Sequence, residues 1–484
     1  MKPRIKFLFF VSMLSLTALC AHIFNIALIK QTSYAQNAAS QRRSTEVIKK
    51  YRGGIYDRNM IPLVDDAAES LTLADGQRTE REKRYSAGTA EHTVGYTLSD
   101  GSGASGIEKA FDEVLTSDAA KSAVYMTDAA GGGLKKSLTE LTAEKPDRNI
   151  KLTIDAAVQK IAEKAADEYI ENGAIVILDV NTFDTAAIVS RPGFDRSNVE
   201  NALVSGDSPL LNRALSPYNA GSIFKIITAA TYLENGGSEE CTYTCGGYVT
   251  ADGMDFKCNS EKGHGELNLK NAFAKSCNSY FYNAAMSVGV DVIMDEARKF
   301  SLGSALLNCG LDESCGHLPE NREFSLRDAA NIGIGQGEIL ITPLQAANMA
   351  CIIAAGGTER NINIADSVVH ADGAEIKDLR GYGEKTVISR RTAYTIGEMM
   401  REAVLEGTAQ AAQNGVVAIA GKTGTAETGW NRDGTPMVHG WFCGFFPYEN
   451  PRYAMAVFAE DGKSGSAACI PAFRQIALEV MRCR

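Results

Sequence analysis

Several features that define specialised classes of protein are scarce in this sequence. Basic residues are in the minority, with 49 Lys and Arg against 59 Asp and Glu among 484 residues. Because an acidic surface repels a phosphate backbone, we expect no nucleic-acid partner. The eleven cysteines are too sparse for a small disulfide-stabilised protein. With 45% hydrophobic and 22% charged residues, the chain is neither disordered nor repetitive, and its length allows about three domains.

One long apolar segment is present, at the N-terminus. Residues 7–29 are almost purely apolar and follow the basic residues Lys2, Arg4 and Lys6. Such a run spans about 30 Å of hydrocarbon, whereas the apolar region of a cleaved signal peptide usually has about 7–15 residues. We therefore expect a retained single-pass anchor. Cleavage near Ala35 and a buried core helix are the alternatives.

The orientation of this anchor is inferred from its two flanks. Only residues 1–6 precede it, and we expect them to be a cytoplasmic tip. Basic residues also follow the anchor, so the positive-inside count alone is ambiguous. Because a long domain after an anchor is exported regardless of flanking charge, we place the rest of the chain on the extracytoplasmic face of the cell membrane.

The remainder divides by composition into two parts. Residues 30–145 are rich in glycine and charge, and residues 146–484 are better patterned. The second part is predicted to contain strands at 150–154, 174–180, 185–190, 416–426, 440–446 and 453–460, and helices at 156–171, 343–355, 391–413 and 470–481. Asp155 and Thr342 are predicted helix caps. Short links between strands favour an antiparallel sheet flanked by helices, an α/β (α+β) fold.

The segment from Gly221 to Lys225 opens another predicted helix and contains a candidate nucleophile. Residues three apart on a helix share a face, so Lys225 can reach the Ser222 hydroxyl. A serine becomes a nucleophile when a base takes its proton, and a lysine acts as that base when burial lowers its pKa. The alternative for so short a pattern is the solvent-exposed first turn of an ordinary helix, without a catalytic role.

Two further short patterns complete a possible site. Ser276-Cys-Asn278 offers a hydroxyl that can relay a proton and an amide that can hold a lysine or a substrate carbonyl, although helix caps use the same residue types. Lys422-Thr423-Gly424-Thr425 combines a cation and two hydroxyls with a glycine, which suits docking of a carboxylate against a strand. The segment 463–466 repeats this pattern, but we expect it to be a loop.

In this order, the three patterns resemble the signature of penicillin-binding proteins and serine β-lactamases. Further segments resemble class B penicillin-binding proteins, especially the short penicillin-binding protein A and sporulation-protein type. These segments are 52–59 and 106–108 in the non-catalytic region, and 212–214, 335–337, 342–345 and 439–442 in the catalytic domain. The resemblance covers nearly everything after the anchor. It departs at Ala220 and Met60, where Pro and Gly are usual.

The resemblance implies a fold and a set of roles. The fold is a penicillin-binding transpeptidase domain at 146–484, preceded by an elongated non-catalytic pedestal at 30–145 and the transmembrane helix at 7–29. Ser222 would attack the carbonyl between the two terminal D-Ala residues of a peptidoglycan stem peptide, with Lys225 as its base. Ser276 and Lys422 would pass a proton to the leaving D-Ala. The substrate-binding residues would be Asn278, Thr423, Gly424 and Thr425, and backbone amides of Ser222 and Thr425 would form the oxyanion hole.

The resemblance also implies partners. They are stem peptides ending in D-Ala-D-Ala, β-lactams that mimic this end, and a SEDS-type glycan polymerase in the membrane, because nothing in the chain resembles a glycosyltransferase. No metal or organic cofactor is implied. One alternative is a serine β-lactamase, which would need a water-activating Glu that the window 312–317 does not supply in the expected pattern. The other is a β-lactam sensor or inactive scaffold.

The cysteine spacing allows more than one interpretation. Cys241-X3-Cys245-X12-Cys258-X5-His264 could pass for a zinc knuckle. Outside the cytoplasm we instead expect a Cys245–Cys258 disulfide and a second pair between Cys309 and Cys315, with free thiols as the remaining alternative. Cys277, inside the second motif, is expected to be a small packing residue.

Overall fold

The computed structural model describes residues 3–41, 43–64, 67–72, 78–84, 89–127, 139–142, 147–307, 309–320, 322–432, 435–460 and 465–483. Its contacts divide the chain into two units. The smaller unit comprises Met1–Arg52, Asp66–Lys83 and Ser117–Pro146, and the larger unit comprises Gly53–Asp65, Arg84–Thr116 and Asp147–Arg484. We describe each unit by itself.

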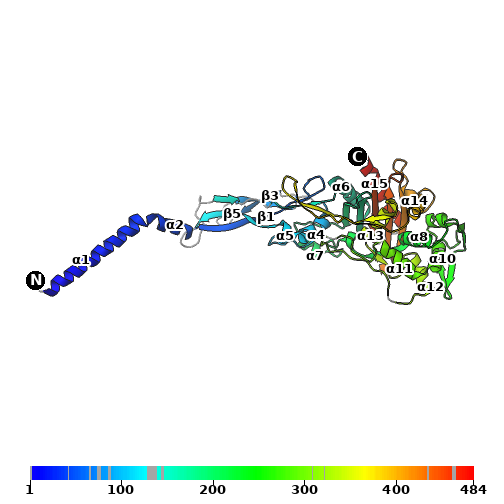
Figure 1. The fold of residues 1–484 in the computed structure, drawn as a ribbon, viewed down its shortest axis with the longest axis horizontal. Helices are drawn as coiled ribbons and strands as arrows, with labels where there is room; N and C mark the ends of the chain where they lie inside the picture. Colours follow the sequence, from blue (N-terminus) through cyan, green and yellow to red (C-terminus); the bar gives the residue numbers. More distant parts are fainter. Residues whose placement is uncertain are drawn as a thin grey trace. The chain divides into compact units, whose positions relative to one another are not determined.

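The smaller unit begins with the apolar helix, drawn in dark blue in Figure 1. Helix α1 (Pro3–Phe24) continues into the π-helical turn η1 (Asn25–Ile29) and is followed by α2 (Gln31–Gln41). An 18-residue window within Pro3–Ile29 has a mean hydropathy of 2.1, and this segment is long and apolar enough to cross a membrane. The strands of this unit are β1 (Arg43–Arg52), β3 (Ala67–Thr72), β4 (Arg78–Lys83), β5 (Thr116–Met126) and β6 (Thr139–Thr142), which form the sheets β1-β5-β6 and β3-β4.

The larger unit is built around a five-stranded antiparallel sheet, as the short links between strands predicted. Its strand order is β20 (Ala420–Arg432), β21 (Thr435–Phe446), β22 (Tyr453–Ala459), β8 (Gly173–Asp179) and β9 (Thr185–Arg191). β22, β8 and β9 closely match predicted strands. β20 starts later than expected and, with β21, continues further into a long hairpin.

Both faces of this sheet are buried, which explains why its strands read as nearly continuous apolar runs. Ala174, Val176 and Leu178 of β8 enter the core on one face, whereas Ile175 and Ile177 enter the core on the other. α6 (Ala156–Tyr169) and α15 (Gly465–Arg482) pack on each other and cover the second face. α13 (Pro343–Ala354) covers the first face, and α14 (Arg390–Leu405) packs against β20. The site described below lies at the β20 edge.

The remaining elements of the larger unit surround this sheet. The helices are α3 (Glu91–Val94), α4 (Gly106–Ala110), α5 (Asp112–Leu115), α7 (Val199–Leu203), α8 (Lys225–Glu234), α9 (Leu269–Ala274), α10 (Asn278–Val288), α11 (Val290–Lys299) and α12 (Leu326–Gly333), with short 3-10 turns η2 (Arg213–Leu215), η3 (Gly221–Phe224) and η4 (Gln410–Ala412). A second sheet has the order β18 (Glu375–Asp378), β17 (Ala365–Val369), β7 (Asn149–Leu152) and β2 (Ile55–Tyr56). The two-stranded pairs are β10 (Tyr218–Asn219) with β15 (Leu340–Ile341), β11 (Tyr243–Cys245) with β14 (Gly265–Leu267), β12 (Tyr248–Ala251) with β13 (Met254–Lys257), and β16 (Thr358–Arg360) with β19 (Glu384–Thr386).

The predicted helix caps are confirmed, but one predicted helix is too long. The Asp155 carboxylate accepts hydrogen bonds from two backbone amides at the start of α6, and Thr342 and Gln345 form a capping box at α13. The helix expected at 391–413 is wrong beyond Leu405, where α14 ends. A Cβ at Gly407 would lie 2.2 Å from the carbonyl oxygen of Ala274, so the chain must leave the helix to make this contact with α9.

An early segment of the chain packs within the larger unit. Ile55 of β2 pairs in parallel with Ile150 of β7. The buried Asp57 carboxylate accepts hydrogen bonds from Asn59 N at 2.8 Å, Ile61 N at 2.7 Å and Ala156 N at 3.1 Å. By its contacts, the segment 53–65 therefore belongs to the larger unit. The domain division between residues 145 and 146 stays a prediction.

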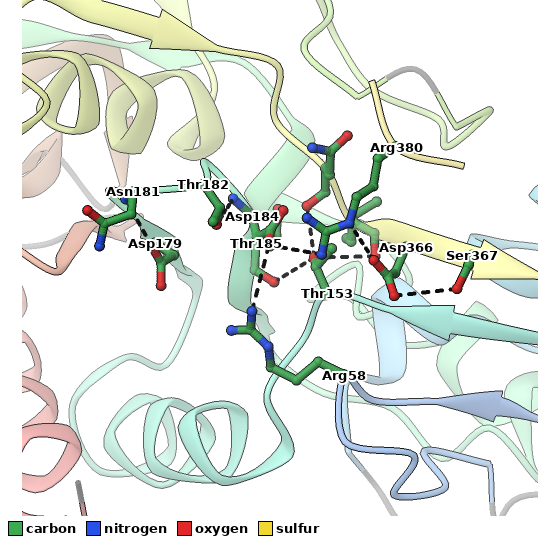
Figure 2. A network of polar contacts seen from close by, with 12 residues as sticks. Arg58, Thr153, Asp179, Asn181, Thr182, Asp184, Thr185, Asp366, Ser367 and Arg380 are labelled. Atoms are coloured by element: carbon green, nitrogen blue, oxygen red, sulfur yellow. Dashed lines mark hydrogen bonds and ion pairs between the residues drawn. The ribbon is translucent and has the colours of Figure 1, made fainter. Parts of the chain in front are cut away.

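A charge cluster around the buried Asp184 joins further segments of the same unit (Figure 2). Arg58 and Arg380 both approach Asp184, whose carboxylate oxygen lies 3.7 Å from one guanidinium and 3.2 Å from the other. Arg380 also pairs with Asp366, which Lys151 contacts at 3.0 Å. Burial raises the pKa of Asp184 in spite of the two cations. Because the desolvation of Asp184 opposes its attraction to the two arginines, these ion pairs are weak evidence for stability.

The three backbone contacts of Asp57 generate a stability prediction. Asp57→Ala leaves two amide donors of the 57–61 turn and one at the start of α6 without their acceptor, so we expect the free energy of unfolding to fall by about 3 kcal/mol. Urea unfolding of the purified full chain in detergent measures this. Asp312→Ala is the control, because its ion pair with Lys109 is solvent-exposed and such pairs contribute about 0–1 kcal/mol. Equal effects of the two substitutions would contradict the assignment.

Candidate active site

The serine of the first motif lies where a short strand leads into a buried helix. β10 ends at Asn219, and η3 carries Ser222 into α8. Gly221 has a φ of +56°, and a Cβ there would lie 2.6 Å from the carbonyl oxygen of Thr425. Only glycine therefore lets this turn approach β20 so closely. The Ser222 side chain is partly exposed, so a substrate can reach it.

Two lysines of the predicted site converge on one serine hydroxyl. The Lys225 ammonium group donates hydrogen bonds to Ser276 O at 2.7 Å, Ser276 Oγ at 3.1 Å and Asn278 Oδ1 at 2.7 Å. The Lys422 ammonium group donates to the same Ser276 Oγ at 2.9 Å and to Thr423 O at 3.0 Å. Residues predicted from three separate motifs thus form a single hydrogen-bond network.

The second motif occupies an uncommon backbone conformation. Ser276 has a φ of +52°, in the left-handed region that non-glycine residues rarely adopt. Ser276 N donates to Phe273 O at 3.0 Å, and Cys277 N donates to Ala272 O at 2.8 Å, so the end of α9 holds this turn. The turn presents both the carbonyl and the hydroxyl oxygen of Ser276 to Lys225. Strain kept in this way is typical of functional sites.

Complete burial changes the ionisation of both lysines. It lowers the pKa of Lys225 to about 7, against the opposing attraction of the Cys277 and Cys258 thiols. Burial and the neighbouring Lys225 charge hold the pKa of Lys422 well below its usual range. Because the two groups share Ser276, they titrate as a coupled pair. Near neutral pH the pair therefore includes an uncharged amine that can accept a proton.

Two phenylalanines that the motifs did not reveal lie beside these lysines. Lys225 Nζ is 5.4 Å from the ring centroid of Phe281, and Lys422 Nζ is 5.7 Å from that of Phe273. An aromatic face attracts a cation and offsets part of its desolvation. Phe281 follows Asn278 by one helical turn of α10, so helical spacing alone could have placed it on the same side.

The third motif forms one wall of the site along β20. Gly424 pairs with Trp441 of β21, and a Cβ at Gly424 would lie 3.0 Å from the Ile223 and Trp441 side chains. The motif therefore needs glycine to pack against the turn that carries the serine. Thr423 is buried and Thr425 is exposed. In the competing pattern at 463–466, Lys463 and Ser464 lie outside the described residues.

Comparison with known proteins identifies the family of the chain. The family model for the penicillin binding protein transpeptidase domain matches residues 173–478. The chain belongs to this family. Its relatives place it among the class B penicillin-binding proteins and include a stage V sporulation protein, so the expected family is confirmed.

Mycobacterial proteins are among those that the chain resembles. The chain is 30% identical over 361 residues to the peptidoglycan D,D-transpeptidase PbpA of Mycobacterium tuberculosis, covering 68% of this chain and 71% of the relative. It is 33% identical over 347 residues to PbpA of Mycolicibacterium smegmatis, covering 65% and 67%. Penicillin-binding protein 3 of M. tuberculosis, solved in complex with aztreonam, superposes with a TM-score of 0.74 at 26% identity over 91% of this chain and 97% of that one.

This penicillin-binding transpeptidase also has a cluster of soft ligand atoms directly beside its second motif. The sulfur atoms of Cys245, Cys258 and Cys277 and a ring nitrogen of His264 all lie within 4.8 Å of one another. His264 Nδ1 is 3.6 Å from both Cys245 Sγ and Cys258 Sγ, and Cys258 Sγ is 3.8 Å from Cys277 Sγ. Three thiolates and an imidazole are a typical ligand set of structural zinc.

The structure corrects the interpretation of these cysteines. All eleven are free, so the expected Cys245–Cys258 and Cys309–Cys315 disulfides are not formed. Cys241 is exposed and outside the cluster, whereas Cys277, expected only to fill space, belongs to it. The reason is the register of β11 with β14, in which Cys245 pairs with Gly265 and brings His264 alongside. The hydrogen bond with Cys277 lowers the pKa of Cys258 to about 3, and a thiol with a lowered pKa is readily present as the thiolate that binds a metal.

A metal-removal experiment tests whether this cluster binds zinc. We expect the full chain, purified under reducing conditions, to contain one Zn²⁺ by mass spectrometry of the metal, and a chelator to lower its melting temperature by several degrees. His264→Ala removes one ligand and should release the metal. His317→Ala, at an exposed histidine, should retain it. A wild-type chain that binds no zinc, or a His264→Ala variant that binds it unchanged, would contradict the prediction.

Proposed function

We propose that Ser222 is the acylated nucleophile of a peptidoglycan D,D-transpeptidase, with Lys225 as its base. The observation that carries this assignment is the convergence of Lys225 and Lys422 on the hydroxyl of Ser276. Such an arrangement offers an amine that can take a proton and a hydroxyl path by which the proton can leave. The relatives named as D,D-transpeptidases support the reaction class.

The first half-reaction forms the acyl-enzyme. As Ser222 Oγ attacks the carbonyl between the two terminal D-Ala residues, its proton passes to Lys225 Nζ. The negative charge that develops on the carbonyl oxygen is stabilised by the backbone amides of Ser222 and Thr425. The contact between Gly221 and the Thr425 carbonyl supports this role, because it brings the two backbone segments side by side. The peptide bond then breaks, and the leaving amine takes a proton through Ser276 and Lys422.

The terminal carboxylate of the donor peptide binds at the β20 wall. Lys422, Thr423 and Thr425 supply the cation and hydroxyl groups, and Gly424 lets the substrate lie close to the strand. Because Lys422 has a lowered pKa, an arriving carboxylate favours its protonated form, so carboxylate binding and lysine protonation reinforce each other. Asn278 holds the peptide while its side-chain oxygen orients Lys225.

The second half-reaction transfers the acyl group to an amine of a neighbouring stem peptide. A β-lactam blocks the cycle because it acylates Ser222 and no amine releases it. The β-lactamase alternative is weaker, since both carboxylate oxygens of Glu313 accept backbone amides, from Leu306 at 2.9 Å and Leu307 at 2.8 Å. These bonds give the Glu313 carboxylate a structural role in holding residues 306 and 307. A sensor or inactive scaffold remains the second candidate.

The N-terminal helix suits a protein that works at the membrane surface. We propose residues 7–29 as a single-pass anchor, residues 30–145 as a pedestal and residues 146–484 as the catalytic domain on the extracytoplasmic face. The helix is long and apolar enough to serve this purpose. The glycan strands that this enzyme cross-links would be supplied by a SEDS-type polymerase in the same membrane.

Substitution of the nucleophile tests the reaction. We expect Ser222→Ala to lose both its labelled-penicillin adduct and its cross-linking of lipid-linked peptidoglycan, because no other group can form the acyl-enzyme. Ser304→Ala, at an exposed serine, is the control and should keep both activities. A stable adduct without any cross-linked product from the wild-type chain would favour the sensor, and rapid release of penicilloate would favour the β-lactamase.

The charge of Lys225 generates a pH prediction. A protonated lysine cannot accept the Ser222 proton, and the fraction of neutral amine rises as pH increases through the pKa of about 7. The second-order rate of acylation by penicillin should therefore fall about ten-fold between about pH 8 and about pH 6. Lys225→Arg, which stays protonated, should abolish acylation at every pH. A flat profile over this range would show that another group is the base.

A further inference from the structure

The turn that follows α14 contacts two walls of the site at once. Thr408 N donates a hydrogen bond to Ala274 O at 3.0 Å, and Gly407 packs so closely on the same carbonyl that no side chain fits there. This fixes the turn to the end of α9, two residues before Ser276. The position of the Thr408 side chain is therefore set by the backbone that also holds the second motif.

The hydroxyl of Thr408 reaches the third motif. Thr408 Oγ1 lies 2.7 Å from Thr423 Oγ1, and either atom can be the donor. Thr423 is only 8% exposed, whereas Thr408 is exposed. Thr408 belongs to none of the three motifs, and yet it is hydrogen-bonded to the buried hydroxyl that we assign to carboxylate binding.

The chemistry of the two hydroxyls decides the direction of this bond when a substrate is present. A threonine hydroxyl has a single proton to donate, and a carboxylate can only accept. If Thr423 donates to the substrate carboxylate, it cannot also donate to Thr408, so Thr408 must donate to Thr423. Donation from Thr408 makes Thr423 a stronger donor, because successive hydrogen bonds polarise one another.

We propose that Thr408 is a positioning residue that turns the Thr423 proton toward the carboxylate of the acyl donor. This inference rests on the proposed function, and it sharpens the substrate class to donors with a free carboxylate next to the scissile amide. Thr408 does not touch the reacting carbonyl. Its effect should therefore depend on the carboxylate and vanish from donors that lack one.

A pair of β-lactams that differ only in this group provides the test. Intact-protein mass spectrometry would measure the acylation rates of the full chain in detergent by penicillin V and by its methyl ester. For Thr408→Val, which keeps the shape but loses the hydroxyl, we expect the rate with penicillin V to fall about five- to ten-fold, as for a lost hydrogen bond near a charge. The rate with the methyl ester should stay within about two-fold of wild type.

Two further variants separate positioning from folding. Thr408→Ser retains a donor and should keep at least half of the wild-type rate with penicillin V. If Thr408→Val does not fold, Thr408→Ala takes its place as the variant without a hydroxyl. Thr386→Val, at an exposed threonine of β19, should leave both rates unchanged. An equal loss with the acid and the ester, or no loss with either, would overturn the proposal. Failure of the wild-type chain to be acylated at all would instead overturn the proposed function.

Discussion

The site depends on a single demanding arrangement, which is the placement of two fully buried lysine ammonium groups on one serine hydroxyl. Removing a charge from water is unfavourable unless hydrogen bonds replace the lost solvent. Here Ser276 and Asn278 supply oxygen acceptors to Lys225, and Ser276 and Thr423 supply them to Lys422. The part of the desolvation cost that these hydrogen bonds do not offset lowers the pKa of both lysines. A lowered pKa makes a neutral amine available as a base.

The rest of the larger unit keeps these groups in place. The central sheet is buried on both faces, so β20 has one register in which Gly424 and Thr425 meet the turn of Ser222. The end of α9 holds Ser276 in its strained conformation, and the Cys277 cluster lies immediately beside it. The central sheet, the end of α9 and the Cys277 cluster therefore all adjoin the atoms around Ser276. A change in any of them should alter the position of the Ser276 hydroxyl.

Local signals in the sequence were enough to find the strands of the central sheet and several of the helices that cover it. Asp155 and Thr342 act through neighbours within three residues, and caps of this kind are readable from a short segment. The order of the three motifs predicted that Lys225, Ser276 and Lys422 would meet, and they do. Their catalytic roles stay predictions until acylation is measured.

What the sequence did not reveal depends on contacts between distant segments. The end of α14 is set by Gly407, which follows the C-cap Glu406 and packs on Ala274, more than a hundred residues away. A glycine at this position is a local signal for a helix end, but the contact that requires it is not local. Membership of Cys277 rather than Cys241 in the cluster follows from the pairing of β11 with β14. The link between Thr408 and Thr423 arises in the same way, from a turn that is fixed by another helix.

The proposed chemistry depends on the reduced charge of the two buried lysines, and NMR of ¹⁵N-labelled lysine side chains measures that charge directly. The Lys225 resonance would be assigned by its loss in Lys225→Arg, and its chemical shift followed from about pH 5 to about pH 11 in the full chain. The account predicts a midpoint near the pKa of about 7 for Lys225. A midpoint close to the ordinary lysine value of about 10.4 would contradict it.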